Sequence, residues 1–333
     1  LVAEASASHL LLTQAEARAG GALARLSGQA RADAGGWRLQ GQATLADFDP
    51  RPWWRGPEGS AWRRGPHRLQ GEASANLLWR PALAARAGDL AIDRLLAALD
   101  GTAQLRLADS LLAGVPLAAD LALQSQGPSA QVRGALTLGG NRLTLDGQGG
   151  ADAATDQWRA TLQAPTLATL GPLRALLDEV APDSAAAIDQ AWPTGGNLQA
   201  TVQTQGRWPA LQSQGTLQAT QLASAGFQLQ QASLSWRQGD RQDAPLQLNL
   251  QAQGLRTAGQ QLDGLTVTLV GTTAEHQIHI NADSPLRPPA WTEHLLGPAG
   301  NGTRLAGEAR GQWLPAGRGA GGRYQLQGLT LNG

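Results

Sequence analysis

The chain has no cysteine, no methionine and no lysine, and all 26 of its cationic residues are arginine. Without cysteine it cannot form a disulfide framework, a thiol nucleophile or a cysteine-ligated metal site. This lack is compatible with an oxidising compartment. Because the chain begins at Leu1 and lacks methionine, we expect it to be an internal fragment of a longer protein, with no signal peptide at its start.

The sequence also lacks an excess charge and a long apolar run. Its 26 acidic residues balance the arginines, so no overall field favours nucleic acid or an anionic membrane. A membrane-spanning helix needs about 18 consecutive apolar residues. The longest candidate, Leu111–Ala119, is about half that length and contains glycine and proline. Phenylalanine and tyrosine are scarce, so the apolar content comes largely from alanine and leucine.

Strict alternation of apolar and polar residues dominates what is present. In Leu246–Ala252 three leucines and an alanine alternate with glutamine and asparagine, which places the apolar residues on one face of a strand. The pattern recurs along the chain and predicts roughly fifteen strands. Between Leu229 and Ala232 the alternation slips by one residue, which predicts a bulge or a turn.

Three stretches depart from the alternation. Leucines recur at helical spacing near 165–192, where Pro172 and Pro182 limit the expected helix to short pieces, and similarly near 82–99. The stretch near 49–67 is rich in proline, tryptophan and arginine and is expected to be irregular. None of the three resembles an interdomain linker, so we expect residues 1–333 to form one continuous repeating segment.

A row of half-buried strands must cover its apolar face. Sandwiches and small barrels usually fill their cores with aromatic and β-branched residues, whereas the inward positions here are mostly leucine and alanine. The sequence therefore predicts an all-β fold: an elongated, curved, antiparallel repeating sheet that forms an open apolar groove, with short helical insertions. We expect acyl chains to contact the groove residues Leu136, Leu138, Leu143, Leu145, Leu246, Leu248, Leu250, Leu265, Val267, Leu269, Ile278 and Ile280.

Five segments resemble recurring elements of one protein family. They are Ala46–Pro50, Leu107–Leu117, Leu138–Leu143, Leu162–Ala168 and Leu265–Ile280. Their succession across most of the chain is similar to the TamB family, the inner-membrane subunits of the bacterial translocation and assembly module. Each segment alone is a weak motif, and it is their order that carries the resemblance.

The resemblance implies a repeating β-groove related to AsmA-like and bridge-like lipid-transfer proteins. It further implies a periplasmic protein that is anchored in the inner membrane of a Gram-negative bacterium and moves phospholipid toward the outer membrane. The implied protein partner is the outer-membrane barrel TamA, which would dock through regions outside this chain. No cofactor and no nucleic acid are expected.

No arrangement of residues predicts catalysis or a metal centre. His276 and His279 lie three apart in an expected strand and so point to opposite faces. Asp47 and Asp49 flank Phe48, and a carboxylate pair can serve acid–base chemistry, but Asp-Phe-Asp-Pro is more typical of a turn. Glycine pairs such as Gly147 and Gly149 lack the following helix of a nucleotide-binding loop. We therefore expect a protein that is not an enzyme.

Arginines and tryptophans are interleaved from Arg51 to Arg68. Three interpretations stay open for this segment: a loop whose tryptophans cover the groove or its edge, a contact with lipid headgroups, and a contact with single-stranded nucleic acid.

Two functions compete for the chain as a whole. One is a groove that conducts or shields lipid, which the monotony of leucine and alanine favours. The other is a scaffold that holds outer-membrane β-strands by strand addition during barrel assembly. A β-solenoid adhesin fits less well, because the strand spacing varies and helical segments interrupt it.

Overall fold

The structure is a computed structural model. It describes residues 2–33, 35–80, 98–127, 129–150, 152–180, 189–207, 210–257, 259–285, 303–315 and 322–332.

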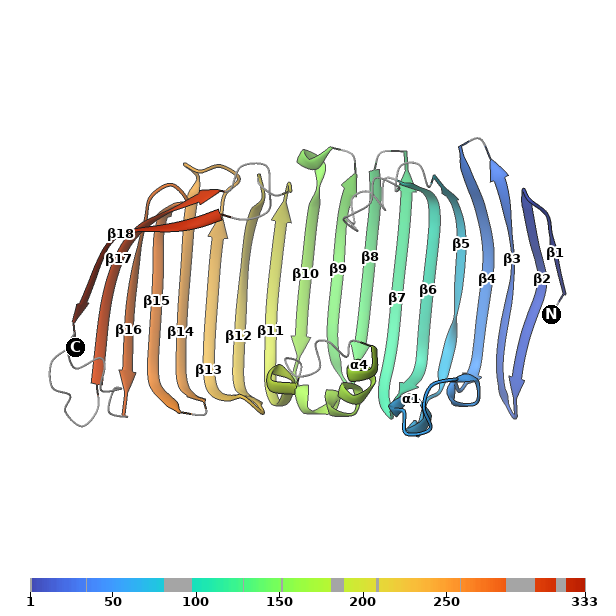
Figure 1. The fold of residues 1–333 in the computed structure, drawn as a ribbon, viewed down its shortest axis with the longest axis horizontal. Coiled ribbons are helices and arrows are strands. Elements are labelled where there is room, and N and C mark those ends of the chain that lie inside the picture. The colour runs from blue at the N-terminus through green and yellow to red at the C-terminus, as the bar shows by residue number, and fades with distance from the viewer. Residues whose placement is uncertain are drawn as a thin grey trace. The chain divides into compact units, whose positions relative to one another are not determined.

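Within these residues, eighteen strands form one antiparallel sheet (Figure 1). The chain divides into two compact units. Unit 1 comprises Leu1–Ala160 and Thr169–Ile188, and unit 2 comprises Thr161–Ala168 and Asp189–Gly333. The prediction of an all-β protein built on one open antiparallel sheet is confirmed.

In unit 1 each strand pairs with the strand that follows it in the sequence. Its strands are β1 (Val2–Ala5), β2 (His9–Ala19), β3 (Ala22–Asp33), β4 (Gly36–Phe48), β5 (Leu69–Trp79), β6 (Leu99–Leu112), β7 (Val115–Gln126), β8 (Ser129–Leu138), β9 (Asn141–Gly150) and β10 (Gln157–Ala164), of which β10 also contributes residues to unit 2.

Unit 2 repeats this consecutive antiparallel pairing. Its strands are β11 (Pro193–Gln205), β12 (Gln212–Ser224), β13 (Phe227–Gln238), β14 (Pro245–Thr257), β15 (Gln260–Thr272), β16 (His276–Ser284), β17 (Thr303–Pro315) and β18 (Gly322–Asn332).

Tight turns keep successive strands adjacent. Between β8 and β9 only Gly139 and Gly140 intervene, with φ of 55° and 83°. Two successive positive φ angles are what a two-residue hairpin turn requires, and glycine adopts them without steric cost. The turn residues thus keep the alternation of β8 in phase with that of β9.

In the described part of the chain the helices with given bounds are few and short. They are η1 (Arg51–Trp53), α1 (Ala61–Arg64), η2 (Ala153–Thr155), η3 (Leu167–Leu173) and α4 (Arg174–Val180). Helices η3 and α4 occupy the stretch near 165–192 where helix was predicted, and Pro172 lies inside the 3-10 segment. Of the helix predicted near 82–99 the structure describes only Ala98 and Leu99, and Leu99 already belongs to β6; the rest lies outside the described residues.

Bends in the strands account for the slip in the alternation. In β13 both Gln230 and Gln231 are exposed, so the strand changes phase at the predicted place. Its partner β12 has a left-handed residue there, Gln221, with φ of 53°. In unit 1, Asp47 and Asp109 are also left-handed and lie where the registers of β4 and β6 shift. These bulges bend the strand ends.

The apolar face of the sheet is not buried as a conventional core. Among the described residues the buried leucines, Leu167, Leu173 and Leu176, all lie in helices. Apart from Val115, the buried apolar residues of the described strands are alanines, as in the cluster of Ala219, Ala232 and Ala252 in unit 2. A sandwich would bury its large aliphatic side chains between two sheets, and here they stay half-buried.

Candidate functional site

In unit 2 the predicted groove residues form continuous apolar rows across the strands. Strand pairing sets side by side the residues of one row, Leu217, Leu234, Leu250, Val267 and Ile280. The next row contains Trp236, Leu248, Leu269 and Ile278. Because residues paired across an antiparallel sheet point to the same side, these rows define the apolar face of unit 2. Ile280 is 37% exposed there, and the other predicted residues are half-buried.

In unit 1 the four predicted residues lie together on β8 and β9. Leu136 pairs with Leu143, and their row continues to Ala119 and Leu107. Leu138 and Leu145 are on the same face in the flanking rows. Leu121, Leu143 and Leu145 are 42%, 41% and 36% exposed. The apolar face of unit 1 therefore presents large aliphatic side chains to its surroundings.

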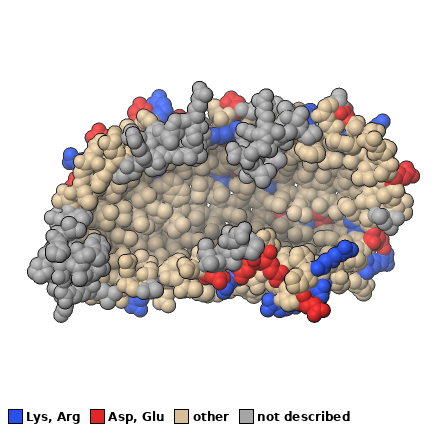
Figure 2. All heavy atoms as spheres, in the orientation of Figure 1, with Lys and Arg blue, Asp and Glu red and all other residues tan. Residues whose placement is uncertain are grey.

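Charged residues are absent from these rows. In unit 1 the first two rows from that of Leu143 toward Gly147 contain Leu26, Ala43, Ala73, Leu105, Leu121, Gly134 and Leu145, and then Gly28, Gly41, Ala75, Ala103, Leu123, Val132 and Gly147. In each unit, the hollowed face seen in Figure 2 is mostly uncharged along the middle of the strands, and charged side chains gather toward the strand ends. Such a surface favours apolar ligands, because an unpaired charge there would be costly.

The opposite face is polar and solvated. In unit 2 it carries glutamine, threonine and serine at the positions between the apolar rows. Gln214 donates to Gln203 at 3.1 Å, and the hydroxyls of Thr201 and Thr216 lie 2.8 Å from each other. The strands are thus two-sided, as the alternation predicted.

Two tryptophans lie against glycines of a neighbouring strand, which the alternation alone did not predict. An added Cβ at Gly215 would come within 2.3 Å of the Trp236 ring, and one at Gly147 equally close to Trp158. The Trp236 indole donates to the Ser213 hydroxyl at 2.9 Å. Each indole therefore covers a glycine on the apolar face of its own unit. A glycine paired with a bulky aromatic on the next strand is the signal that would have revealed this packing.

The segment near 49–67 forms an ordered edge of unit 1. The rings of Trp54 and Trp62 stack at 5.3 Å, and that of His67 lies 5.8 Å from Trp62. The Ala113 amide donates to His67 Nδ1 at 3.1 Å, and His67 Nε2 donates to the Trp62 carbonyl at 3.1 Å. Burial lowers the pKa of His67. The imidazole is therefore a neutral structural link between this segment and the turn after β6.

A carboxylate from α4 fastens the same segment. Glu179 accepts from the Ser60 hydroxyl at 2.5 Å and from the Ala61 amide. These are the groups at the N-terminal end of α1, where unpaired amides favour a negative charge. Figure 1 shows α1 and α4 at the same edge of the unit 1 strands.

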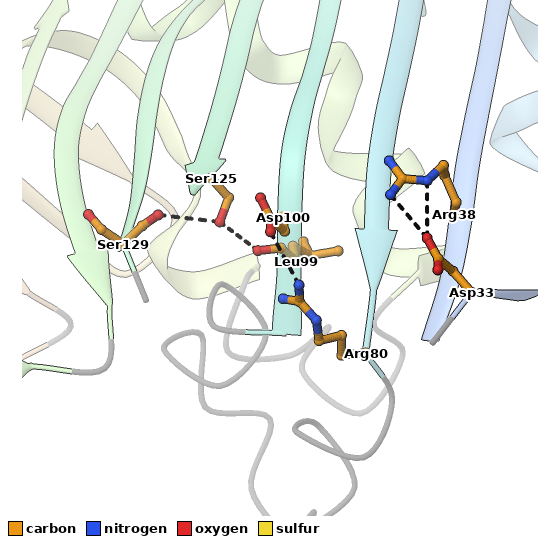
Figure 3. A network of polar contacts seen from close by, with 7 residues as sticks. All are labelled: Asp33, Arg38, Arg80, Leu99, Asp100, Ser125 and Ser129. Carbon is orange, nitrogen blue, oxygen red and sulfur yellow. Dashed lines mark hydrogen bonds and ion pairs between the residues drawn. The ribbon is translucent and has the colours of Figure 1, made fainter. Parts of the chain in front are cut away.

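Polar groups near the opposite ends of these strands are paired with one another (Figure 3). Arg80 contacts Asp100 at 3.3 Å, and Arg38 contacts Asp33 at 3.0 Å. The buried Ser125 donates to the Leu99 carbonyl at 2.6 Å. The Ser125 hydroxyl lies on the apolar face, and this bond directs it to the backbone.

The other polar residues considered from the sequence have structural contacts. His276 is buried on the apolar side of β16, with Nδ1 3.0 Å from the Thr272 carbonyl, and His279 is exposed on the other side, as predicted. Asp49 accepts from the Arg51 amide at 3.0 Å, which confirms a side-chain-stabilised turn. The hydrogen bond from the Arg51 side chain also lowers the pKa of Asp49. The described residues contain no cluster of three potential metal ligands.

The chain was compared with protein-family models, curated proteins and solved structures. No family model, no curated protein and no solved structure matches the chain. In the described part of the chain, no helix is both long enough and apolar enough to cross a bilayer.

Proposed function

We propose that the chain is a lipid-binding segment of a TamB-type bridge, in which acyl chains lie on the apolar faces of the two units while headgroups stay toward the strand ends. The observation that carries this proposal is the combination of large, partly exposed aliphatic side chains with uncharged rows, seen in Leu121, Leu143 and Ile280. Acyl chains are mobile and uncharged, and they need an apolar surface without specific polar pockets.

The energetic gain for such a ligand is substantial. Burial of apolar surface contributes roughly 25 cal/mol per Å², or about 0.8 kcal/mol per methylene group. An acyl chain that covers half-buried leucines removes apolar surface of both partners from water. The same burial would stabilise the sheet, because a ligand that binds only the folded state adds to its free energy of unfolding.

In this proposal the full-length protein lies in the periplasm, moves phospholipid toward the outer membrane and meets the barrel TamA through other regions. The direct test is mass spectrometry of lipid that stays with the folded chain through detergent-free purification and size exclusion. We expect phospholipid in amounts of about one molecule per chain or more. Lipid at the level carried by an unrelated protein of similar size would overturn the proposal.

A second function is favoured by β18. This strand pairs with β17 alone among the described strands, and its Leu326 and Leu329 are 50% and 56% exposed. Natural sheets usually protect an edge strand with proline, charge or bulges. The run from Leu326 to Leu331 has no proline and no charged residue, and its one irregularity is a register shift at Gln327. A client β-strand could add here. Two results together would favour this scaffold function. They are crosslinks from residues of β18 to an unfolded outer-membrane protein, and the absence of lipid from the purified chain.

A further inference from the structure

The edge of unit 1 formed by Asp49–Arg68 carries five arginines and two acidic residues, Asp49 and Glu58. Exposed arginines stand at Arg51, Arg55, Arg63, Arg64 and Arg68. Arg51 pairs with Asp49, and Arg63 donates to the Trp54 carbonyl at 3.2 Å. In the parts of the chain that the structure describes, no carboxylate forms an ion pair with Arg55, Arg63 or Arg64. Figure 2 shows basic and acidic side chains together along the strand ends.

Contacts within the segment and one contact from α4 hold the backbone that carries these arginines. The stack of Trp54, Trp62 and His67 forms its interior, and Glu179 fastens its short helix to α4. Because Glu179 occupies the end of α1, the backbone amides of that helix are not the anion site. The free positive charge lies on the arginine side chains.

Apolar side chains accompany the arginines at the surface. Trp53, two residues before Arg55, is 47% exposed, and α4 presents Leu177 and Val180 at 40% and 67% exposure. Exposed tryptophan and aliphatic residues beside arginine match the interfacial zone of a bilayer, where apolar groups enter between headgroups and cations meet phosphate. Arginine suits phosphate because its fork of donors can engage two oxygens at once.

We propose that this edge, formed by Asp49–Arg68 with α4, docks on the surface of a bilayer that contains anionic phospholipid. Single-stranded nucleic acid fits less well, because successive bases stack on several open aromatic faces. Trp53 is exposed, but Trp62 already stacks on both Trp54 and His67. Docking would bring unit 1 against a membrane surface, and it does not depend on lipid occupying the apolar faces.

The test uses the whole 333-residue chain and flotation with vesicles of phosphatidylglycerol and phosphatidylcholine at a ratio of about 3 to 7, or of phosphatidylcholine alone. We expect the chain to bind the anionic vesicles and not the neutral ones. Its affinity for the anionic vesicles should fall as the salt concentration rises. The variant Arg55→Gln/Arg63→Gln/Arg64→Gln should bind anionic vesicles on the order of 100-fold more weakly, since each arginine near such a surface contributes a factor of about five.

The matched control is Arg142→Gln/Arg237→Gln/Arg256→Gln, which removes the same charge from exposed positions in other strands. It should keep most of the binding, while Trp53→Ala should lower it several-fold. Circular dichroism verifies the fold, and Arg55→Gln alone serves if the triple variant does not fold. Equal loss in both triple variants, equal binding to neutral vesicles, or no vesicle binding at all would overturn the proposal. So would tighter binding to oligothymidine with the same dependence on Arg55, Arg63 and Arg64.

The vesicle experiment also separates this proposal from the proposed function. Leu248→Arg alters the apolar face of unit 2 and leaves the edge of unit 1 untouched, so it should bind vesicles as the wild type does. Vesicle binding without co-purified lipid would support the docking edge and count against the lipid-filled groove, and the reverse result would do the opposite.

Discussion

The indole of Trp236 lies against Gly215 of the neighbouring strand, so closely that a methyl group on the glycine would come within 2.3 Å of the ring. The same methyl group would come within 2.4 Å of the Thr201 carbonyl oxygen in β11. Because Gly215 has no side chain, the Trp236 ring can pack flat over it on the apolar face of unit 2.

This contact predicts that Gly215→Ala destabilises the fold. Overpacking of a filled site typically costs about 1–3 kcal/mol, and both Trp236 and the β11 backbone would have to move. Urea unfolding followed by circular dichroism measures the effect. Gly195→Ala in β11 is the control, because no atom lies within 4 Å of its added Cβ, and we expect that variant to be as stable as the wild type. Equal losses in the two variants would contradict the packing role of Gly215.

A second prediction concerns the link between α4 and α1. Glu179→Ala removes the acceptor of the Ser60 hydroxyl and the Ala61 amide. Loss of a cap or of a hydrogen bond to a charged group costs about 1–3 kcal/mol. Hydrogen exchange of residues 60–64 should accelerate, whereas exchange in β14 should stay unchanged. Glu58→Ala removes an exposed carboxylate of the same segment and should leave the exchange of residues 60–64 as it is.

The pH dependence of stability should report His67. Burial lowers its pKa in the folded chain, so the unfolded chain binds a proton more readily than the folded one. The free energy of unfolding therefore rises with pH between the lowered pKa of His67 in the folded chain and its ordinary pKa in the unfolded chain. The contribution of His67 is complete above its ordinary pKa of about 6.5 and is lost as the pH falls through the lowered folded value.

The variant His67→Asn tests this, because its side-chain oxygen can still accept from the Ala113 amide but does not titrate near neutral pH. Urea unfolding at pH 7.5 and at pH 5.5 gives the loss of stability on acidification. We expect the wild type to lose more than the variant. A variant that loses as much as the wild type would show that other groups cause the acid sensitivity.

Local patterns predicted the strands and the orientation of their side chains, because the two-residue period of a strand fixes which face each residue occupies. Leu246, Leu248 and Leu250 could be assigned to one face without any knowledge of the fold. The rows themselves depend on register, and here the two-residue turns, such as Gly139–Gly140, keep adjacent strands in phase.

Contacts between distant residues could not be predicted in the same way. Ser60 and Glu179 are 119 positions from each other in the sequence, and neither belongs to a motif that identifies its partner. The same holds for His67 and the Ala113 amide. Such pairs arise from the three-dimensional path of the chain, so the ordered edge of unit 1 appeared in the sequence only as an unassigned stretch of arginine and tryptophan.

The final prediction places a charge on the apolar face of unit 2. Leu248 lies in mid-strand, half-buried, with Trp236 and Leu269 beside it on the neighbouring strands. In a dry core Leu248→Arg would cost several kcal/mol and unfold the unit. On an open face the long side chain can bend outward and keep its guanidinium in water. We therefore expect a folded protein with a modest loss of stability.

The effect on lipid is read by photo-crosslinking from a benzophenone side chain at position 267, where Val267 lies on the apolar face of the adjacent strand. Leu248→Arg should lower the lipid crosslink severalfold, because the charge interrupts the apolar surface that acyl chains cover. Asn249→Arg adds the same charge to the exposed side of β14 and should leave the crosslink unchanged. Unfolding of Leu248→Arg would indicate a closed core and a structural or scaffolding role. A folded Leu248→Arg that crosslinks lipid as well as Asn249→Arg would remove the support for a lipid-carrying face.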